Sequence, residues 1–525
     1  MLFGTDDDAL RRTAKYPYIY LSRIDWNDHG YITGFYAMLN EKAGSEAKKI
    51  GHLKIGQQGM KHDYTKAYLE DPVRVNFSNS TFSCLDSQYF SVATDIEYYE
   101  TLNKMGEPVA RAVLKGLNDV AFSKNAMEVA TQEAVFTESL LRDISIMTVK
   151  DDFYNTIFNE QSKKRSYEIE LSVAKEVRHT PVKFTVKPDS FPPSNLHVLI
   201  GRNGVGKSYF FKSLINSLSV PSKQKIIDNK DPYFEEIKGL DNISSILVIG
   251  YSAFDTTIPR DERSAILSQN KVRYNFIGLP EESVVNNKAS SQSIDDRASN
   301  AKLIEKAMIE EFKKVTSEIL DRPSRREMLS DAIQQLQSDP VFKDNKVLDW
   351  FQDQNEESRP ELFSKLSSGH TIVLLMVMEV VRHLENYSLI LIDEPETHLH
   401  PPLLSSLIKT IEALLIQKNA IGIVATHSPV VLQEVDSECA WILNRANHAI
   451  SFTRPDIQTY GENLNTLLRE VFKLEVNSSG FEQTIHDVVQ KCDTIEDVRK
   501  KFNNRLSANA ERIALIDLEM KLHDK

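Results

Sequence analysis

Cysteine is scarce in this 525-residue chain, and long uncharged hydrophobic runs are missing. The three cysteines, Cys84, Cys439 and Cys492, are far apart and odd in number. They exclude a disulfide framework or a cysteine-built zinc site and favour a reducing compartment. The best apolar run, residues 372–378, ends at Glu379, well short of the roughly 18 residues of a membrane helix. The acidic start, MLFGTDDDAL, is unlike a signal peptide. We therefore expect a cytoplasmic protein that makes no membrane contact.

Basic charge is also in short supply. The formal net charge is -12, which excludes a surface that is basic all round, so any contact with DNA would need a local basic patch. Internal repeats and long low-complexity tracts are absent as well, which argues against a solenoid. At roughly 150 residues per domain, the length suggests two to four domains with ample chain to bury a core.

A phosphate-binding loop is the strongest feature that is present. Residues 199–214 read LIGRNGVGKSYFFKSL and fit the template G-x-x-x-x-G-K-[ST]. The apolar run 196–200 predicts a buried parallel strand before the loop, and 209–218 predicts a helix after it. Glycines let successive backbone N–H groups turn toward a phosphate at the helix N-terminus. Lys207 would then reach the β- and γ-phosphates of ATP, and Ser208 would offer its hydroxyl to Mg²⁺. The predicted ATP-binding residues here are Gly201, Asn203, Gly204, Gly206, Lys207 and Ser208.

An acidic pair follows a second apolar run. Residues 389–392 predict another buried strand, and Asp393 and Glu394 come directly after it. Open α/β sheets place their ligands at the carboxyl ends of the strands. Asp393 is suited to the Mg²⁺ shell, and Glu394 to orienting or deprotonating the attacking water. The alternative is a pair of ordinary acids at a helix N-terminus.

Two further segments end in polar residues. LSSGH, residues 366–370, precedes an apolar helix at 371–384. Taken alone it is a good N-cap, but a helix N-terminus with a serine hydroxyl is also a second phosphate-binding device. The strand predicted at 421–425 is followed by THSP, which places His427 at the same expected sheet edge. His427 could hydrogen-bond a γ-phosphate or its attacking water, although a histidine at a strand end is more often structural.

The segments GRNGVGKS, LSSGH, LILIDEP and VATHSP, in this order, resemble ATP-binding-cassette ATPases of the soluble kind, alongside RecF and SMC proteins and the overcoming-lysogenisation-defect nucleases. The resemblance implies an α/β head with a mixed and parallel sheet, antiparallel outer strands and helical insertions. It also implies a homodimer that sandwiches two ATP molecules with Mg²⁺. By resemblance, Ser367 and Gly369 bind the γ-phosphate of the other subunit's nucleotide, Glu394 is the catalytic base, and His427 is the switch histidine.

A resemblance to a narrower group of proteins rests on less specific motifs. Residues 89–102, 248–255, 460–464 and 468–472 look like the ATPase PtuA of Septu-type anti-phage systems, in the subgroup encoded with retrons. This resemblance implies a regulatory ATPase that controls a small HNH nuclease, with a reverse transcriptase and its RNA-linked DNA as further partners. The residues after His427 are too few for the TOPRIM nuclease domain of related chains. We therefore expect any nuclease to come from another chain.

Two features depart from the cassette pattern, and a pair of histidines raises a separate question. The glutamine that normally contacts Mg²⁺ and the attacking water is expected near residues 251–255, which read YSAFD, so that Ser252 or Asp255 substitutes for it or hydrolysis is slow. The signature ends in His370, where glutamine or glutamate is common. The pair His398 and His400 could bind a metal, but no carboxylate or cysteine constellation accompanies it in the sequence. By resemblance, this pair belongs to the loop that crosses the dimer interface.

The expected organisation has five parts. Residues 1–186 would form an N-terminal lobe that supplies outer strands, such as 52–55 and 167–171, with a helical insertion between them. The remaining parts are a phosphate-loop lobe at 187–260, a helical arm or lid at 261–360 with a mobile loop at 286–301, a lobe with the signature, the acidic pair and His427 at 361–455, and C-terminal helices at 456–525.

Two other functions stay open at the level of sequence. One is a scaffold that is locked by nucleotide and holds a toxin inactive, which the missing glutamine favours and the intact Glu394 and His427 oppose. The other is a RecF-like or SMC-like repair ATPase that clamps DNA. Such a protein would need a basic groove, and the negative net charge gives no indication of one.

Overall fold

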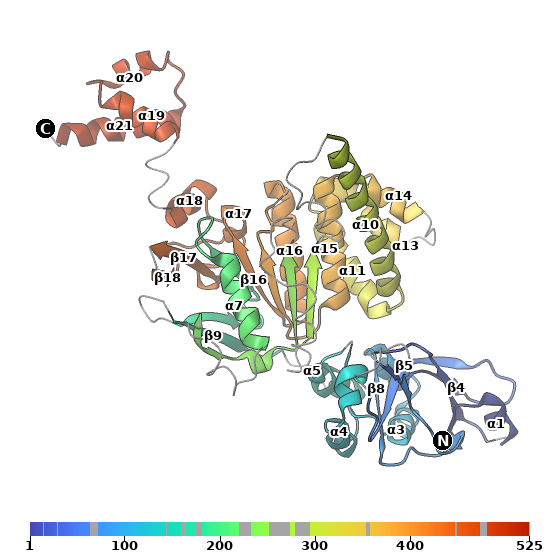
Figure 1. The fold of residues 1–525 in the computed structure, drawn as a ribbon. Helices are drawn as coiled ribbons and strands as arrows, with labels where there is room; N and C mark the ends of the chain where they lie inside the picture. The colour runs from blue at the N-terminus through green and yellow to red at the C-terminus, as the bar shows by residue number, and fades with distance from the viewer. Residues whose placement is uncertain are drawn as a thin grey trace.

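The computed structural model describes residues 1–523 except 14, 29, 63–71, 143, 159–163, 175–180, 220–232, 251–272, 279–293, 353–357, 398, 447–448 and 473–479. Figure 1 shows a central sheet flanked by helices, with separate units formed by the two ends of the chain. Among the described residues, no helix combines the length and hydropathy needed to cross a bilayer.

The central sheet has seven strands, and parallel pairing joins all of them except the last pair. The order is β14 (Arg273–Gly278), β13 (Ser245–Gly250), β15 (Leu389–Asp393), β16 (Ile421–Thr426), β11 (Leu196–Ile200), β17 (Ala440–Ala446) and β18 (Ala449–Thr453). Every residue of β11, β15 and β16 is buried, as expected of parallel strands covered on both faces.

Alternate residues of these strands enter two different cores. Val198 and Ile200 of β11 face a helical layer, whereas Leu199 faces α7 (Lys207–Ser219) and a small outer sheet. The helical layer consists of α10 (Ile294–Leu320), α11 (Pro323–Leu336), α12 (Pro340–Asp344), α13 (Val347–Gln352), α14 (Arg359–Ser364), α15 (Ser368–His383) and α16 (Pro401–Gln417). The outer sheet is antiparallel, in the order β10 (Val182–Val186), β9 (Tyr167–Val173) and β12 (Phe234–Lys238). The predicted α/β fold with antiparallel outer strands is confirmed.

The N-terminal region forms a sheet of its own. Its order is β7 (Thr81–Phe82), β1 (Leu2–Gly4), β2 (Tyr18–Arg23), β4 (Gly34–Asn40), β5 (Lys48–Gln57) and β8 (Tyr89–Ala93), and β3 (Tyr31–Ile32) pairs with β6 (Val73–Arg74). The helical segments of this region are α1 (Asp7–Arg12), α2 (Glu97–Lys104), α3 (Glu107–Gly116), α4 (Lys124–Ala130), η1 (Phe136–Leu140), α5 (Ile146–Thr148), η2 (Val149–Phe153) and α6 (Tyr154–Phe158). They cover a hydrophobic core that runs from Phe3 to Phe153.

This arrangement corrects one expectation. Residues 52–55 were expected in the same outer layer as 167–171, but they lie in β5, between β4 and β8. The physical reason is packing, because Leu53 and Ile55 are buried in the N-terminal core, whereas Ile169 and Leu171 are buried against the phosphate-loop helix. Both strands have similar apolar patterns, so pattern alone does not say which sheet each one joins.

Helices α10 and α11, which lie in the segment 261–360 that was expected to form an arm, pack against the head. Phe312 and Val315 of α10 and Ile333 of α11 are buried in the same core as α15 and α16. Helix α10 also begins at Ile294, so residues 294–301 are helical and the predicted loop at 286–301 is wrong there, while 286–293 lie outside the described residues. Two aspartates, at 295 and 296, favour a helix N-terminus at this point.

The C-terminal region is helical, as predicted for 456–525. After α17 (Pro429–Leu432) and η6 (Ser437–Cys439), helix α18 (Leu464–Phe472) packs on the head through Leu467. The last three helices, α19 (Phe481–Val489), α20 (Ile495–Lys501) and α21 (Ala508–His523), share a small core of their own. A short helix, η3 (Leu240–Asn242), precedes β13.

Candidate active site

The phosphate loop joins β11 to α7 and depends on its glycines. Gly204 and Gly206 have φ angles of 77° and 110°, in the left-handed region that favours glycine. A Cβ on Gly201 would lie 2.5 Å from the carbonyl oxygen of Leu443. These backbone demands explain why glycine stands at all three positions. Asn203 is exposed in the same loop, and Ser208 lies in the first turn of α7.

Lys207 is buried at the base of this loop. Its Nζ donates to the carbonyl oxygens of Gly201 and Arg202, at 3.1 Å each, and lies 3.7 Å from Oε1 of Glu394. Burial lowers the pKa of Lys207, and the carboxylates of Glu394, Glu396 and Asp393 oppose that shift. A phosphate would be a stronger partner for this ammonium group than neutral carbonyls are.

Strand register brings the other predicted residues to the same place. β16 lies between β11 and β15, with Ile200 opposite Thr426 and Asp393 opposite Ala425. The phosphate loop, the acidic pair and His427 therefore leave the sheet at one edge. His427 Nδ1 is 4.0 Å from Oε1 of Glu394. Lys207, Glu394 and His427, predicted from segments far apart in the sequence, converge around a single carboxylate.

The backbone of Glu394 is itself unusual. Its φ is 45°, a left-handed conformation that costs a non-glycine residue free energy and is common at functional sites. Its N–H donates to the carbonyl oxygen of Ala425 at 2.8 Å. This bond, made to the neighbouring strand, holds the turn that aims the carboxylate toward Lys207.

Glu396 is a functional residue that sequence reasoning missed. Its Oε1 accepts from the hydroxyl of Thr426 at 2.7 Å and from the backbone N–H of His427 at 2.8 Å, and lies 2.9 Å from His427 Nδ1. The side chain of Glu396 is 10% exposed. It therefore fixes the histidine from two sides. One sequence feature could have pointed to Glu396. The run DEPET contains a second glutamate, two residues after Glu394.

Two oxygen-bearing side chains are available for Mg²⁺. Ser208 is the second residue of the phosphate-loop helix, and Asp393, 6% exposed, is the last residue of β15. Mg²⁺ prefers hard oxygen ligands and usually takes only one or two carboxylates from the protein. The donor set therefore fits the ion.

The signature residues lie on a different element. Ser367 is the N-cap residue of α15, but its side chain accepts no hydrogen bond from the helix. Its Oγ lies 2.6 Å from Nδ1 of His370, whose Nε2 lies 3.2 Å from Oδ1 of Asp339. Gly369 is buried in the first turn. In the described chain, the hydrogen bonds of Ser367 go to His370 and Thr371 and not to the phosphate loop.

Residues 251–255, with Ser252 and Asp255 as possible substitutes for the glutamine, lie outside the described residues, as does His398. His400 lies at the N-cap of α16, where its Nδ1 accepts from the N–H of Leu403. The expectation that no carboxylate accompanies His400 is wrong, because polar atoms of His400, His370 and Asp339 all lie within 4.8 Å of one another.

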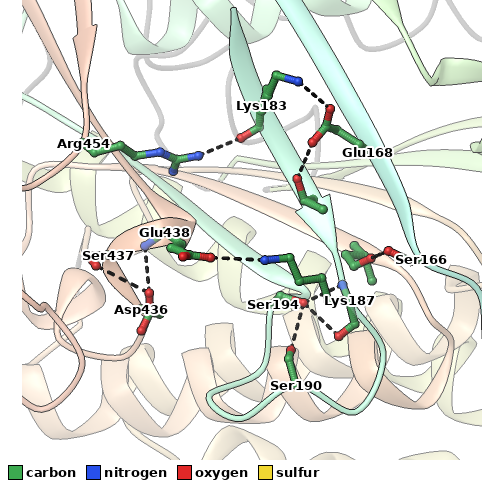
Figure 2. A network of polar contacts seen from close by, with 12 residues as sticks. Ser166, Glu168, Lys183, Lys187, Ser190, Ser194, Asp436, Ser437, Glu438 and Arg454 are labelled. Atoms are coloured by element: carbon green, nitrogen blue, oxygen red, sulfur yellow. Dashed lines mark hydrogen bonds and ion pairs between the residues drawn. The ribbon is translucent and has the colours of Figure 1, made fainter.

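A second polar site occupies the opposite edge of the sheet, where β11 and β17 begin. Its cavity, about 250 Å³ in volume, is lined by Lys183, Thr185, Lys187, Ser194, His197, Ser437, Glu438, Cys439 and Arg454. Figure 2 shows two ion pairs here, Lys183 with Glu168 at 2.9 Å and Lys187 with Glu438 at 3.2 Å. Ligands of open α/β sheets bind at the other ends of the strands, so this cavity is not the nucleotide site.

Comparison with known proteins agrees with this geometry. Residues 196–433 match the family model described as "AAA domain, putative AbiEii toxin, Type IV TA system". The protein ea59 of Escherichia phage lambda is 30% identical over 522 residues, which cover 94% of this chain and 93% of ea59. The chain belongs to the ea59 family.

Defence-associated ATPases match over shorter stretches. The "Retron Vc95 probable ATPase" of Vibrio cholerae serotype O1 biovar El Tor is 31% identical over 114 residues, which cover 20% of this chain and 22% of that protein. The Septu protein PtuA of Bacillus mycoides (strain KBAB4) is 24% identical over 373 residues, covering 61% of this chain and 47% of PtuA. The resemblance to PtuA and the retron-encoded ATPases, predicted from residues 89–102, 248–255, 460–464 and 468–472, is confirmed.

Proposed function

We propose that this member of the ea59 family binds and hydrolyses ATP with Mg²⁺ as a regulatory subunit of an anti-phage defence system. The observation that carries the proposal is the convergence of Lys207, Glu394 and His427 where three neighbouring parallel strands end. A lysine from a glycine loop, a carboxylate and a histidine are the groups that phosphoryl transfer to water requires.

Each residue has a distinct part in this reaction. The γ-phosphate of ATP would replace the carbonyl groups that now accept from Lys207. Glu394 would take a proton from the water as its oxygen bonds to the γ-phosphorus and the bond to ADP breaks. His427, held by Glu396, would hydrogen-bond the γ-phosphate. Ser208 and Asp393 would hold Mg²⁺, which neutralises charge on the β- and γ-phosphates.

A second copy of the chain would complete the site. In the described residues, Ser367 bonds to His370 and Thr371 on its own helix, which leaves the phosphate loop of the same chain without a signature serine. We propose a cytoplasmic homodimer, in which Ser367 and Gly369 of each copy approach the nucleotide that the other copy holds. ATP binding would close this dimer and hydrolysis would open it.

The partner proposals are supported by the relatives. Proteins named as a retron ATPase and as Septu PtuA share sequence with this chain. We therefore propose that the dimer controls an HNH nuclease, in a complex that also holds a reverse transcriptase and its RNA-linked DNA. Direct DNA contact would have to use a local basic patch, because the net charge is negative.

The test compares ATP turnover and molecular mass, with and without Mg-ATP, for the wild-type protein, Glu394→Gln and Lys207→Ala. Glu438→Gln, which changes a glutamate at the opposite edge of the sheet, is the matched control. We expect Glu394→Gln to lose about 10²- to 10⁴-fold in turnover and to accumulate as an ATP-bound dimer, and Lys207→Ala to lose ATP binding. Equal turnover in Glu394→Gln and the wild type would refute the role of Glu394. If both the wild type and Glu394→Gln bind ATP tightly but neither hydrolyses it, the nucleotide-locked scaffold would be favoured.

A further inference from the structure

Three side chains with metal-binding atoms meet where three helices of the helical layer begin. Asp339 is the N-cap residue of α12, His370 lies in the first turn of α15, and His400 is the N-cap residue of α16. One ligand atom from each of them lies within 4.8 Å of the other two. Within the described residues, this is the one group of three or more histidine, cysteine or acidic side chains that comes so close together.

The buried part of the group already has the spacing of metal ligands. His370 Nε2 lies 3.2 Å from Asp339 Oδ1, and the two residues are 5% and 3% exposed. Zn²⁺ bonds of about 2.0–2.2 Å to nitrogen and oxygen, set at a tetrahedral angle, separate two ligand atoms by roughly 3.3–3.6 Å. A zinc ion could therefore bind both atoms with little movement of either side chain.

The carboxylate of Asp339 favours a cation at this place. Buried carboxylates are usually paired with a positive charge or bound to a metal ion. In the described part of the chain, the imidazole of His370 is the one basic group within ion-pair distance of Asp339. Asp339 Oδ1 also accepts from the N–H of Val341 at 2.9 Å, and carboxylates that bind metals are commonly held by such bonds. A divalent cation would therefore stabilise a carboxylate that the chain already holds in place.

The surroundings of His370 suit a ligand that binds through Nε2. A metal-bound histidine usually donates its other ring N–H to a nearby acceptor, which fixes the orientation of the ring. His370 Nδ1 lies 2.6 Å from Oγ of Ser367, and the ring of Phe342 packs edge-on against the imidazole. The hydroxyl oxygen of Ser367 can accept from Nδ1–H. The contact that Ser367 makes in place of an N-cap bond is thus the outer support expected for a metal ligand.

His400 forms the open side of the group. Its side chain is exposed, so an ion can reach it from solvent, and its ring centroid lies 5.9 Å from that of His370. His400 Nδ1 accepts from the N–H of Leu403 at 3.3 Å, which is longer than the usual hydrogen-bond range of about 2.7–3.2 Å. The ring would give up this long bond and move by roughly 1 Å to reach bonding distance.

We propose that Asp339, His370 and His400 form a zinc site that joins the N-terminal ends of α12, α15 and α16. Two imidazoles and one carboxylate are a donor set for Zn²⁺, whereas Mg²⁺ and Ca²⁺ prefer oxygen ligands. A water molecule would take the fourth position, as in other zinc sites with three protein ligands. The site uses none of the residues proposed to hold Mg²⁺ and requires no nucleotide. The ion would tie the helix that follows LSSGH to the two helices beside it.

The experiment measures binding of Zn²⁺ alone to the full-length protein, after removal of metal with a chelator and without nucleotide. The variants are His370→Ala, His400→Ala and Asp339→Asn, which keeps the shape of the side chain and an N-cap oxygen but loses the charge. His383→Ala is the matched control, because His383 lies in the last turn of α15, 3.5 Å from the Glu379 carboxylate and outside the group. Metal content, zinc affinity by competition with a chelator, and thermal unfolding with and without Zn²⁺ are measured for each protein.

We expect the wild type and His383→Ala to bind one Zn²⁺ per chain, with a Kd of about 1 μM or tighter. Both should unfold at a higher temperature with Zn²⁺ present, because only the folded chain brings the ligands together. His370→Ala and His400→Ala should each bind at least about 100-fold more weakly, since losing a ligand should cost more than the roughly 10- to 100-fold that losing its outer support costs. Asp339→Asn should bind at least about 10-fold more weakly.

Two results would overturn the inference. One is a wild-type protein that binds no Zn²⁺ and is not stabilised by it. The other is equal zinc affinity in His400→Ala and the wild type, which would place the ion elsewhere. His400→Ala decides the question even where a buried substitution impairs folding, because His400 is exposed and the stability of each zinc-free protein is measured directly. Failure of the proposed function is distinguishable, because zinc binding is measured without ATP.

Discussion

Replacing Glu396 tests how His427 is held. One oxygen of this carboxylate receives the Thr426 hydroxyl at 2.7 Å and the His427 N–H at 2.8 Å, and lies 2.9 Å from the His427 imidazole. In Glu396→Gln the side-chain oxygen can still accept from the first two donors, but the negative charge beside the imidazole is lost. The substitution therefore separates the electrostatic part of the contact from its packing.

The size of the effect follows from the type of bond. Hydrogen bonds to charged groups contribute about 1.5–3 kcal/mol and neutral ones about 0.5–1.5 kcal/mol. Losing the charge beside His427 should therefore cost about 1–2 kcal/mol, which is roughly a 5- to 30-fold loss of kcat if the whole of it appears in the transition state. Glu396→Ala should cost more, because two donors are left without an acceptor at about 1–3 kcal/mol each.

The assay is ATP turnover, with nucleotide affinity and thermal unfolding measured on the same preparations. Glu396→Gln should keep its affinity for ATP and most of its stability while kcat falls, and Glu396→Ala should lose both kcat and stability. His427→Ala gives the reference for complete loss of the histidine. Full turnover in Glu396→Gln, beside a His427→Ala variant slowed at least 100-fold on the scale of a lost oxyanion-hole donor, would refute the role given to Glu396.

Two further predictions concern burial and the backbone. Burial lowers the pKa of His197 to about 3 from 6.5, so the native protein binds fewer protons than the unfolded chain between these values, and stability should fall as pH drops below 6.5. The loss should be about 2 kcal/mol at pH 5, and urea unfolding of His197→Gln should show less of it. Gly201→Ala should weaken binding of an ATP analogue at least 10-fold, because the new Cβ would lie 2.5 Å from the Leu443 carbonyl, a displacement of the loop worth at least about 1.4 kcal/mol. Gly204→Ala should act through backbone strain alone, at about 1–2 kcal/mol for a non-glycine residue at φ 77°, since its Cβ would meet no atom within 4 Å.

The site residues that the sequence predicts are those that lie in short, contiguous motifs. Lys207 lies in a loop whose spacing matches the phosphate-binding template, and Glu394 and His427 each follow an apolar run typical of a buried strand. Parallel strands end at a common edge, so their convergence was predictable without coordinates.

The parts that sequence missed depend on contacts between distant segments. Asp339 lies 31 residues before His370, in a stretch that the sequence predicts only as part of a helical arm or lid. Residues 52–55 and 167–171 have similar alternation, and only their packing partners assign them to different sheets. Glu396 was visible in the sequence, but its role appears only when Thr426 and His427 lie beside it.

The start of α15 shows how coordinates can separate two readings that sequence leaves equal. A serine before a helix is most simply an N-cap, whose hydroxyl accepts from an N–H of the first turn. Ser367 has the extended backbone of an N-cap residue, but its side chain makes no such bond and contacts His370 instead. The first-turn N–H groups are therefore not used by this hydroxyl, and a helix N-terminus in that state favours an anion. The cap interpretation therefore accounts for the backbone of Ser367 but not for its side chain, and phosphate binding by this serine stays a proposal.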